Sequence, residues 1–419
     1  MHRYELISCH DCGVLHRLRP VAPRAKARCV RCRSVLYRGS AADLTRMAAI
    51  TLGAAIVFLI AQLCPIVELE LNGIHSTATL GEAIGVLWSQ QLQAVALGVL
   101  LFTIVFPAIE LSALLYVTLS LRAGFRPPGM HRLLRAAVKA RQWGMTEVLM
   151  LGILITIVKM SSKTIVTLQP GMFAFGALTV MLAIVTSFDP RRLWRIADEL
   201  VRPAPVPPRY TRIDAQTPAL ACHACGLVCA ESGARRQHCA RCGSTLHRRQ
   251  PHSIMRTWAL LVAAAILYIP ANVLIVMHSR TLLGGQDDDT IISGVVYFWN
   301  TGSQALAVII FIASIVVPVA KLAALTVLAY TAQRRSQWRP YQRTVLYRLL
   351  EVVGRWSMLD IFVIALSVAL VRFSTLAEMK AGPGALAFCS VVVLTMLASM
   401  QFDPRLIWDP VKHSGEPHA

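Results

Sequence analysis

Eight of the 11 cysteines occur as four pairs, and two residues separate the cysteines of each pair. This spacing lets both thiolates of a pair point at one ion from a tight turn, and two such turns complete a tetrahedral shell around Zn²⁺. The gap between pairs is 16 residues in the first set and 13 in the second. We predict two zinc ribbons, with ligands Cys9, Cys12, Cys29 and Cys32 in the first and Cys222, Cys225, Cys239 and Cys242 in the second.

The predicted zinc sites are structural, because four thiolates leave no open coordination position for a reaction. A redox dithiol is the alternative interpretation of a CxxC pair, but four pairs in two similar sets favour metal. Further residues near the pairs are alternative ligands: His10, His16, His223, His238 and Cys229. Cys64 and Cys389 fall in apolar runs and are predicted to serve packing.

Two charged side chains interrupt apolar runs in the C-terminal half. Lys321 lies 13 residues before Arg334, about 20 Å along a helix, so its ammonium group does not easily reach that end. Charges inside a membrane cost free energy and are candidates for function. We predict a polar transport cluster of Lys321, Asp360, Ser314, Ser357 and Thr395. For each hydroxyl alone, helix packing is the competing interpretation.

Membrane-spanning helices are expected to position these side chains. The chain of 419 residues is 55% hydrophobic and only 15% charged, and its mean hydropathy is +0.55. A span needs about 20 mostly apolar residues. The sequence offers eight such runs, at 47–67, 93–121, 144–160, 171–188, 257–277, 304–331, 356–373 and 384–402. The polar segment before the first run shows no signal peptide, so this run is predicted to be an uncleaved anchor.

The formal charge of +20 is concentrated in particular segments. Segments 122–142 and 334–355 are rich in arginine, whereas segments 68–91 and 279–303 carry most of their charge as acids. The positive-inside rule predicts that the basic segments and both termini are cytoplasmic. The basic charge therefore indicates topology and contact with anionic lipid, and nucleic acid is not an expected partner.

The chain contains an internal repeat, whose two copies are offset by roughly 210 residues. The sequence "VFPAIELSALL" (105–115) aligns with "VVPVAKLAALT" (316–326), and "RQWGMTEVLML" (141–151) aligns with "GRWSMLDIFVI" (354–364). We predict an all-α polytopic protein of two tandem four-helix units with two small ribbons. The predicted division is 1–45 ribbon 1, 46–201 unit 1, 202–220 linker, 221–250 ribbon 2, 251–412 unit 2 and 413–419 tail.

The two copies differ at the polar cluster, because Lys321 aligns with Glu110 and Asp360 with Glu147. A Lys–Asp pair is therefore specific to the second half. Prolines at matching places in long apolar runs, Pro107 and Pro318, are expected to kink their helices.

Residues near the ends of the spans are predicted to be anchors rather than sites. Lys159 and Arg372 align with each other near outer helix ends. The repeated "FDPR" segments (188–191 and 402–405) are expected to place their arginines and the following Trp194 and Trp408 in the headgroup layer.

Together these features resemble the paraquat-inducible protein A family, with its PqiA-like and LetA-like branches. The most specific stretches are "GRWSMLDIFVIAL" and "FDPRLIWD" in the second half, which leans to the LetA-like branch. The resemblance implies a Gram-negative inner-membrane protein that works with a periplasmic mammalian-cell-entry (MCE) domain protein. It also implies a role in moving lipid between membranes and a tetraspanin-like fold for each four-helix unit.

Two main functions fit this combination. The first is a phospholipid transporter or loader that works through the cluster around Lys321, without ATP hydrolysis since no GxxxxGK[ST] sequence is present. The second is a membrane scaffold that anchors the MCE protein and recruits cytoplasmic factors through its ribbons. A metal or redox sensor is a third interpretation, and no enzymatic activity is expected.

Overall fold

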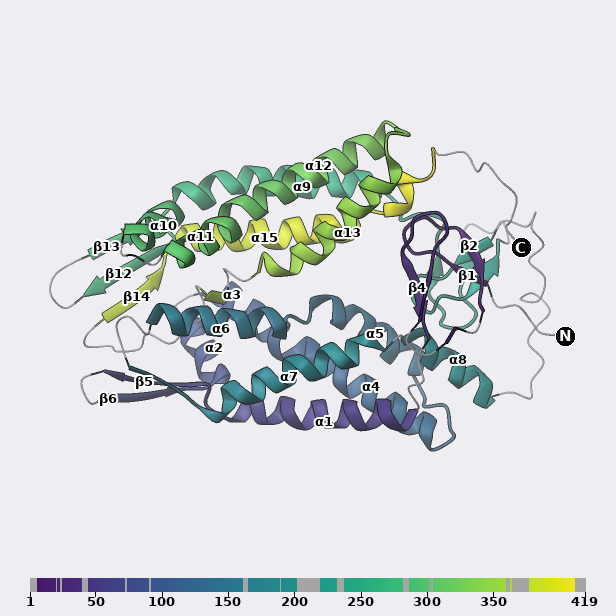
Figure 1. Ribbon diagram of the computed structural model, residues 1–419, viewed down its shortest axis with the longest axis horizontal. Coiled ribbons are helices and arrows are strands. Elements are labelled where there is room, and N and C mark those ends of the chain that lie inside the picture. Colours follow the sequence, from purple (N-terminus) through teal and green to yellow (C-terminus); the bar gives the residue numbers. More distant parts are fainter. Residues whose placement is uncertain are drawn as a thin grey trace.

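The structure is a computed structural model, and it describes most of the chain. The described residues are 6–19, 21–22, 25–39, 44–71, 74–89, 92–160, 165–188, 190–201, 219–231, 237–281, 286–300, 302, 304–358, 362–363 and 377–410. Two bundles of helices lie side by side, with small cysteine-bearing hairpins at one end and small sheets at the other (Figure 1). The fold is mostly helical, as predicted.

The first half begins with four short strands, followed by one bundle. The strands are β1 (Leu6–Ser8), β2 (Leu15–Arg17), β3 (Lys26–Arg28) and β4 (Val35–Arg38). The helices are α1 (Leu44–Leu63), α2 (Leu80–Ser89), α3 (Gln93–Leu100), the π-helix η1 (Leu101–Val105), α4 (Phe106–Arg122), α5 (Met130–Trp143), α6 (Thr146–Met160), α7 (Pro170–Ser187) and α8 (Pro190–Val201).

The second half repeats this order among its described residues. Its hairpins are formed by β8 (Ala219–Ala221), β9 (Val228–Ala230), β10 (Gln237–His238) and β11 (Thr245–Leu246). Its helices are α9 (Ser253–Val273), α10 (Ile291–Asn300), α11 (Gln304–Phe311), the π-helix η3 (Ile312–Val316), α12 (Val317–Gln333), α13 (Pro340–Trp356), α15 (Pro383–Gln401) and the 3₁₀-helix η4 (Pro404–Ile407).

Six described helices are long and apolar enough to cross a membrane: Leu44–Leu63, Gln93–Arg122, Pro170–Ser187, Ser253–Val273, Ala307–Gln333 and Pro383–Gln401. They correspond to six of the eight predicted runs. The run 144–160 contains α6, which has 15 residues, and most of the run 356–373 lies outside the described residues. The count of eight spans therefore stays a prediction.

Each half carries a three-stranded antiparallel sheet that the all-α prediction missed. In the first half the order is β6-β5-β7, with β5 at Val67–Leu71, β6 at Ile74–Ala78 and β7 at Ile165–Leu168. In the second half the order is β13-β12-β14, with β12 at Met277–Thr281, β13 at Gln286–Asp289 and β14 at Ala377–Ala381. The alternation of apolar and acidic residues in "VELEL" (67–71) is a strand pattern, so the sequence held a signal for this sheet.

The two predicted kinks are short π-helices that end just before Pro107 and Pro318. Proline has no N–H to donate, so the carbonyl five residues before Pro107, that of Phe102, has no partner within its own helix. Met145 N, at the break between α5 and α6, donates to Phe102 O at 3.2 Å. The N–H at the break between α5 and α6 thus satisfies the carbonyl of η1 that proline leaves without a partner.

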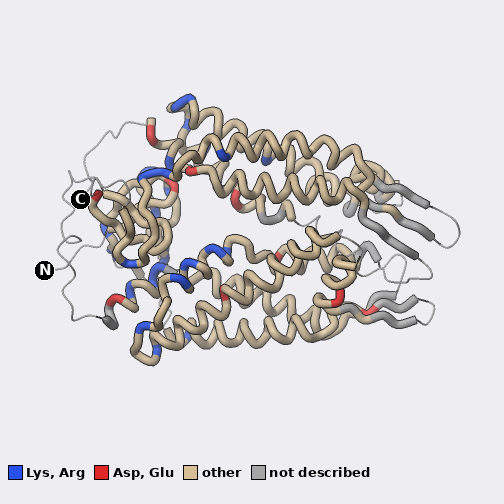
Figure 2. Tube along the Cα trace, turned by 180° about the vertical axis from the view of Figure 1, so that it is seen from behind, with Lys and Arg blue, Asp and Glu red and all other residues tan. Residues whose placement is uncertain are grey.

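The basic segments form amphipathic helices at the end of the molecule that carries the cysteine hairpins. Helix α5 takes up the C-terminal part of the basic segment 122–142, and α13 takes up most of the basic segment 334–355. Among the residues that Figure 2 colours by charge, lysine and arginine gather at this end. Basic residues are therefore concentrated at one end of the long axis of the molecule, the end with the cysteine hairpins.

Candidate metal centres and intramembrane polar site

The predicted zinc ligands form two compact, buried groups. In each group one Sγ atom per cysteine lies within 4.8 Å of the other three, and all eight cysteines are buried. The closest Sγ pairs are Cys9–Cys32 at 3.4 Å and Cys12–Cys29 at 3.5 Å, and their counterparts in the second group lie at similar distances. A metal ion of tetrahedral preference fits this donor set, with Zn–S bonds of about 2.3 Å.

Tight turns present each cysteine pair, as the spacing predicted. The residue four positions after the first cysteine of each pair has a left-handed backbone, and its N–H donates to that cysteine's carbonyl. Three of these residues are Gly13, Gly226 and Gly243, for which a positive φ costs little. The fourth is Arg33, with φ of 58°. This turn aims both thiols of a pair at the same point.

Hydrogen bonds among the clustered thiols lower the pKa of some cysteines and raise the pKa of others, as for Cys12, whose pKa is raised by its hydrogen bond with Cys29. Hydrogen bonding with Cys12 lowers the pKa of Cys9 to about 6 and also lowers the pKa of Cys32. Ser34 Oγ lies 3.0 Å from Cys9 Sγ, and Ser244 Oγ lies 3.0 Å from Cys222 Sγ. Metal binding needs deprotonated thiols, so the cysteines with a lowered pKa are the ones already disposed to bind a metal ion, and the others must lose a proton as it binds.

The alternative ligands lie around the centres. His16 Nε2 is 3.3 Å from Cys29 Sγ, and burial lowers the pKa of this imidazole. Cys229 is buried, and a hydrogen bond with Cys239 lowers its pKa. Both groups of potential ligands found among the described residues consist of the four predicted cysteines alone.

The N-terminal ribbon packs on the second half of the chain rather than on the first. Arg348 of α13 donates to Asp11 Oδ2, at 2.7 Å from Nε and 2.6 Å from the Nη2 nitrogen, and also to Cys32 O at 2.9 Å. Arg405 donates to His10 O at 3.2 Å. The guanidinium of Arg31 lies 4.8 Å from the centre of the Trp408 ring.

The second ribbon packs on the first half, so the two ribbons are crossed. Arg241 in this ribbon pairs with Asp198 of α8 at 2.8 Å. A methyl group on Gly226 would lie 3.1 Å from Arg191 Cδ, just as Gly13 lies beside Arg405 in the other pairing. Each "FDPR" arginine therefore packs against the first cysteine turn of the other half's ribbon.

The structure packs the residues of the "FDPR" segments inside the protein, whereas the sequence predicted side chains that reach into the headgroup layer; the depth of the segments in a membrane stays a prediction. Trp194 is 1% exposed and Trp408 is 6% exposed. Trp408 Nε1 donates to Thr344 Oγ1, and Asp403 accepts from Arg405 N as a helix cap. The ribbons cover these residues, a long-range contact that no local pattern predicts.

Lys321 is buried in the second turn of α12, near the middle of the long apolar helix Ala307–Gln333, as its distance from Arg334 predicted. Its side chain is 1% exposed, and Nζ has no hydrogen-bond partner within the described part of the chain. A methyl group on Gly354 of α13 would lie 3.5 Å from Nζ, in ordinary van der Waals contact, so the ammonium lies directly beside this glycine. An unpaired buried ammonium is costly unless a ligand or a further side chain compensates it.

Other members of the predicted cluster are buried too. Ser314 lies in η3, and Ser357 directly follows α13 with no hydrogen-bond partner for its Oγ among the described atoms. Thr395 Oγ1 donates to Val392 O in α15. Asp360, Lys159's side chain and Arg372 fall outside what the structure describes, so a contact between Lys321 and Asp360 stays a prediction.

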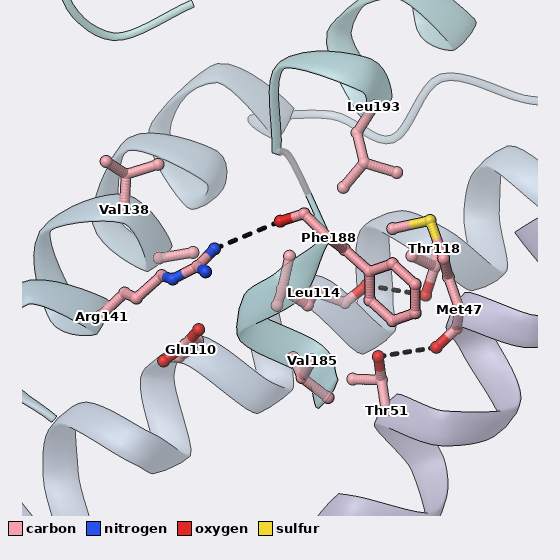
Figure 3. A pocket seen from close by; sticks show the side chains of 11 residues that line it. Met47, Thr51, Glu110, Leu114, Thr118, Val138, Arg141, Val185, Phe188 and Leu193 are labelled. Carbon is pink, nitrogen blue, oxygen red and sulfur yellow. Dashed lines mark hydrogen bonds between the residues drawn. The ribbon is translucent and has the colours of Figure 1, made fainter. Parts of the chain in front are cut away.

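The first half holds a counterpart that the sequence reasoning missed. Glu110, aligned with Lys321, is buried and faces Arg141 across a cavity of about 10 Å³ (Figure 3). Arg141 also donates to Phe188 O at 3.3 Å. Arg141 aligns with Gly354, so the alignment held the signal. The first half has an acid and an arginine where the second half has a lysine and a glycine.

Comparisons with known proteins match nearly the whole chain to members of one family. The sequence model of the family described as paraquat-inducible protein A matches residues 44–198 and 254–412. "Intermembrane transport protein PqiA" of Escherichia coli K12 is 34% identical over 410 residues, which is 97% of this chain and 96% of that protein. "Lipophilic envelope-spanning tunnel protein A" of the same organism is 30% identical, over 96% of this chain and 90% of that protein.

A third relative, "Probable intermembrane transport protein" of Haemophilus influenzae, is 29% identical over 97% of this chain and 96% of its own length. These identities do not favour the LetA-like branch. No solved structure matches the chain.

Proposed function

Because the chain belongs to the paraquat-inducible protein A family, we propose that it is the inner-membrane component of an intermembrane lipid transport system. The names of two relatives, one for intermembrane transport and one for a lipophilic envelope-spanning tunnel, support this role. In the proposal the cargo is phospholipid, and a periplasmic MCE-domain tunnel protein takes it up or delivers it. The chain is a transport protein and not an enzyme.

The observation that carries the proposal is the environment of Lys321. An ammonium group that is 1% exposed and lacks a hydrogen-bond partner among the described atoms has unused capacity to bind an anion. A phospholipid that moves through the protein would bring its phosphate, an anion, to this site. Glycine at position 354 lies beside the ammonium in the second half. In the first half the aligned position is Arg141, whose side chain faces Glu110. The second half is therefore the proposed transport unit.

For the two cysteine groups we propose structural Zn²⁺. Eight buried thiols in two tetrahedral sets suit zinc, and the contacts with α8, α13 and η4 suit a structural role. These contacts use ribbon surface within the chain, which argues against the scaffold alternative, in which the ribbons would recruit cytoplasmic factors.

The proposed topology has eight spans in two tandem units, with both termini, both ribbons and the basic helices in the cytoplasm. The gathering of arginine and lysine at the ribbon end supports this orientation (Figure 2). The small sheets and the short helices α2 and α10 then face the periplasm, where the tunnel protein would dock. The predicted domain division, with its linker at 202–220, belongs to this proposal.

The test is transport by variants that remove one charge at a time. Lys321→Met and Asp360→Asn should each lower lipid transfer from proteoliposomes to the partner by at least about tenfold, since each removes a charge from the buried cluster. Thr326→Ala, on an exposed face of the same helix, is the matched control and should transfer lipid normally. Normal transfer by both charge variants at normal expression would remove the basis of the proposal.

A further inference from the structure

A second polar cavity lies outside the membrane helices, where both ribbons and the end of the second half meet. Its volume is about 560 Å³, within the range of small-molecule sites. Its lining includes Arg31 of ribbon 1, the segment His247–Arg249 at the end of ribbon 2, and Arg405 and Asp409 after α15. Segments far apart in the sequence therefore build one site.

Positive charge is in excess around this cavity. Four arginines line it against one carboxylate, and Arg249 already pairs with that carboxylate, Asp409. The site to which Cys12 belongs would have a net charge of about −2 with Zn²⁺ bound to its four thiolates, and positive charge would still be in excess around the cavity. Burial lowers the pKa of Arg405, and the nearby Arg249 and Arg191 lower it further, although Asp403 opposes them. The four guanidinium groups line one cavity, and an anion bound there would offset their mutual repulsion.

Two of the arginines are held in place by the ribbon contacts. Arg31 stacks over Trp408, and Arg405 is fixed through its bond to His10 O. Arginine presents a planar fork of N–H donors that matches the oxygens of a phosphate group. Pre-positioned guanidinium groups lose little freedom when an anion binds, which favours binding.

We propose that this cavity binds a phosphate group of a ligand about the size of a phospholipid headgroup or a soluble organic phosphate. The site is separate from the intramembrane cluster around Lys321 and does not depend on the proposed lipid movement. A ligand here contacts both ribbons and the end of α15 at once, so it links the two halves at their ribbon end.

The experiment uses the full chain with both ribbons loaded with zinc. For the soluble source, inorganic pyrophosphate is titrated calorimetrically against the chain in phosphatidylcholine nanodiscs. For the lipid source, native mass spectrometry measures how much phosphatidylglycerol the chain retains from mixed nanodiscs. The variants are Arg31→Gln and Arg248→Gln, and the matched control is Arg38→Gln, an exposed ribbon arginine outside the cavity.

We expect binding of one probe, weakened about tenfold or more by each cavity variant and unchanged in the control. Zinc content at the level of the parent shows that a variant is folded. Lys321→Met should leave pyrophosphate binding unchanged, and each cavity variant should lower phosphatidylglycerol retention by the same factor in the parent and in the Lys321→Met background, so a failure of the transport proposal does not affect the result. Absence of binding for both probes, or binding that neither cavity variant weakens, would overturn the inference.

Discussion

At the scale of the residue, the eight paired cysteines could be assigned from the sequence, because CxxC spacing alone fixes which thiols share a turn. The structure gathers the same eight side chains and no others into the two potential metal groups of its described part. The fifth buried cysteine of ribbon 2, Cys229, offers an internal comparison, because it sits beside Cys239 without joining the group.

We predict that Cys9→Ser and Cys222→Ser each lower the zinc content of the purified chain from two ions to about one, since three thiolates hold zinc far less well than four. Thermal unfolding should begin at lower temperature, because metal binding and ribbon folding are coupled. Elemental analysis of the purified variants measures this. Cys229→Ser is the control and should keep two ions; loss of zinc in that variant would show that the ligand set is wrong.

Lys321 and Asp360 could be singled out by the sequence, but their contact could not, since it depends on how two helices are rotated. We predict that their substitutions are coupled: Lys321→Met and Asp360→Asn together should destabilise less than the sum of the two singles, by about 1 kcal/mol or more. Thermal denaturation in detergent of the parent, the two single variants and the double variant gives the double-mutant cycle. Additive effects would mean that the two side chains do not meet.

At the scale of the element, the crossed ribbons tie the two halves together. Asp11 and Arg348 are 337 positions apart in the chain, so no periodicity or local motif announces their contact. The π-helices could be placed only as kinks at Pro107 and Pro318. Their form depends on neighbours such as Met145, whose N–H takes up the carbonyl that proline leaves free. The strand pattern in 67–71 was present but short, and apolar runs on both sides dominate it.

We predict that Asp11→Arg and Arg348→Asp each loosen ribbon 1 from α13. Each removes charged hydrogen bonds of about 1.5–3 kcal/mol between partly buried groups, so limited proteolysis of the ribbon should be about tenfold faster. The double variant restores opposite charges at the same two positions, and it should recover much of the protection.

The control for this pair is Arg38→Asp, a charge reversal at an exposed position of the same ribbon. It should leave the rate of proteolysis unchanged. Parent-like protection in both single variants would mean that the pair does not hold the ribbon on the second half.

At the scale of the whole molecule, the two ends of the long axis differ in charge and in structure. The sequence predicted this polarity from the arginine-rich segments, and the structure places ribbons and basic helices together at one end (Figure 2). The repeat predicted two similar halves. It did not predict that each ribbon packs on the other half, because a repeat describes order along the chain and not which copies meet.

We predict that Asp288→Cys is labelled by a membrane-impermeant maleimide in cells whose outer membrane has been made permeable. Ser336→Cys, at the ribbon end, should be labelled only after the inner membrane is opened as well. The background variant replaces Cys64 and Cys389 with serine, since the other native cysteines are buried in the ribbons. Labelling of Ser336→Cys in spheroplasts would reverse the proposed orientation.

The central claim is that lipid passes beside Lys321 in the second half and not beside the matching site in the first. Photo-crosslinking tests it most directly, with a photoreactive amino acid at position 357 next to this cluster and, as the control, at the aligned position 144. We expect mass spectrometry to find phospholipid attached at position 357 and much less at position 144, with zinc content unchanged in both. Equal capture at the two positions, or none at position 357, would contradict it.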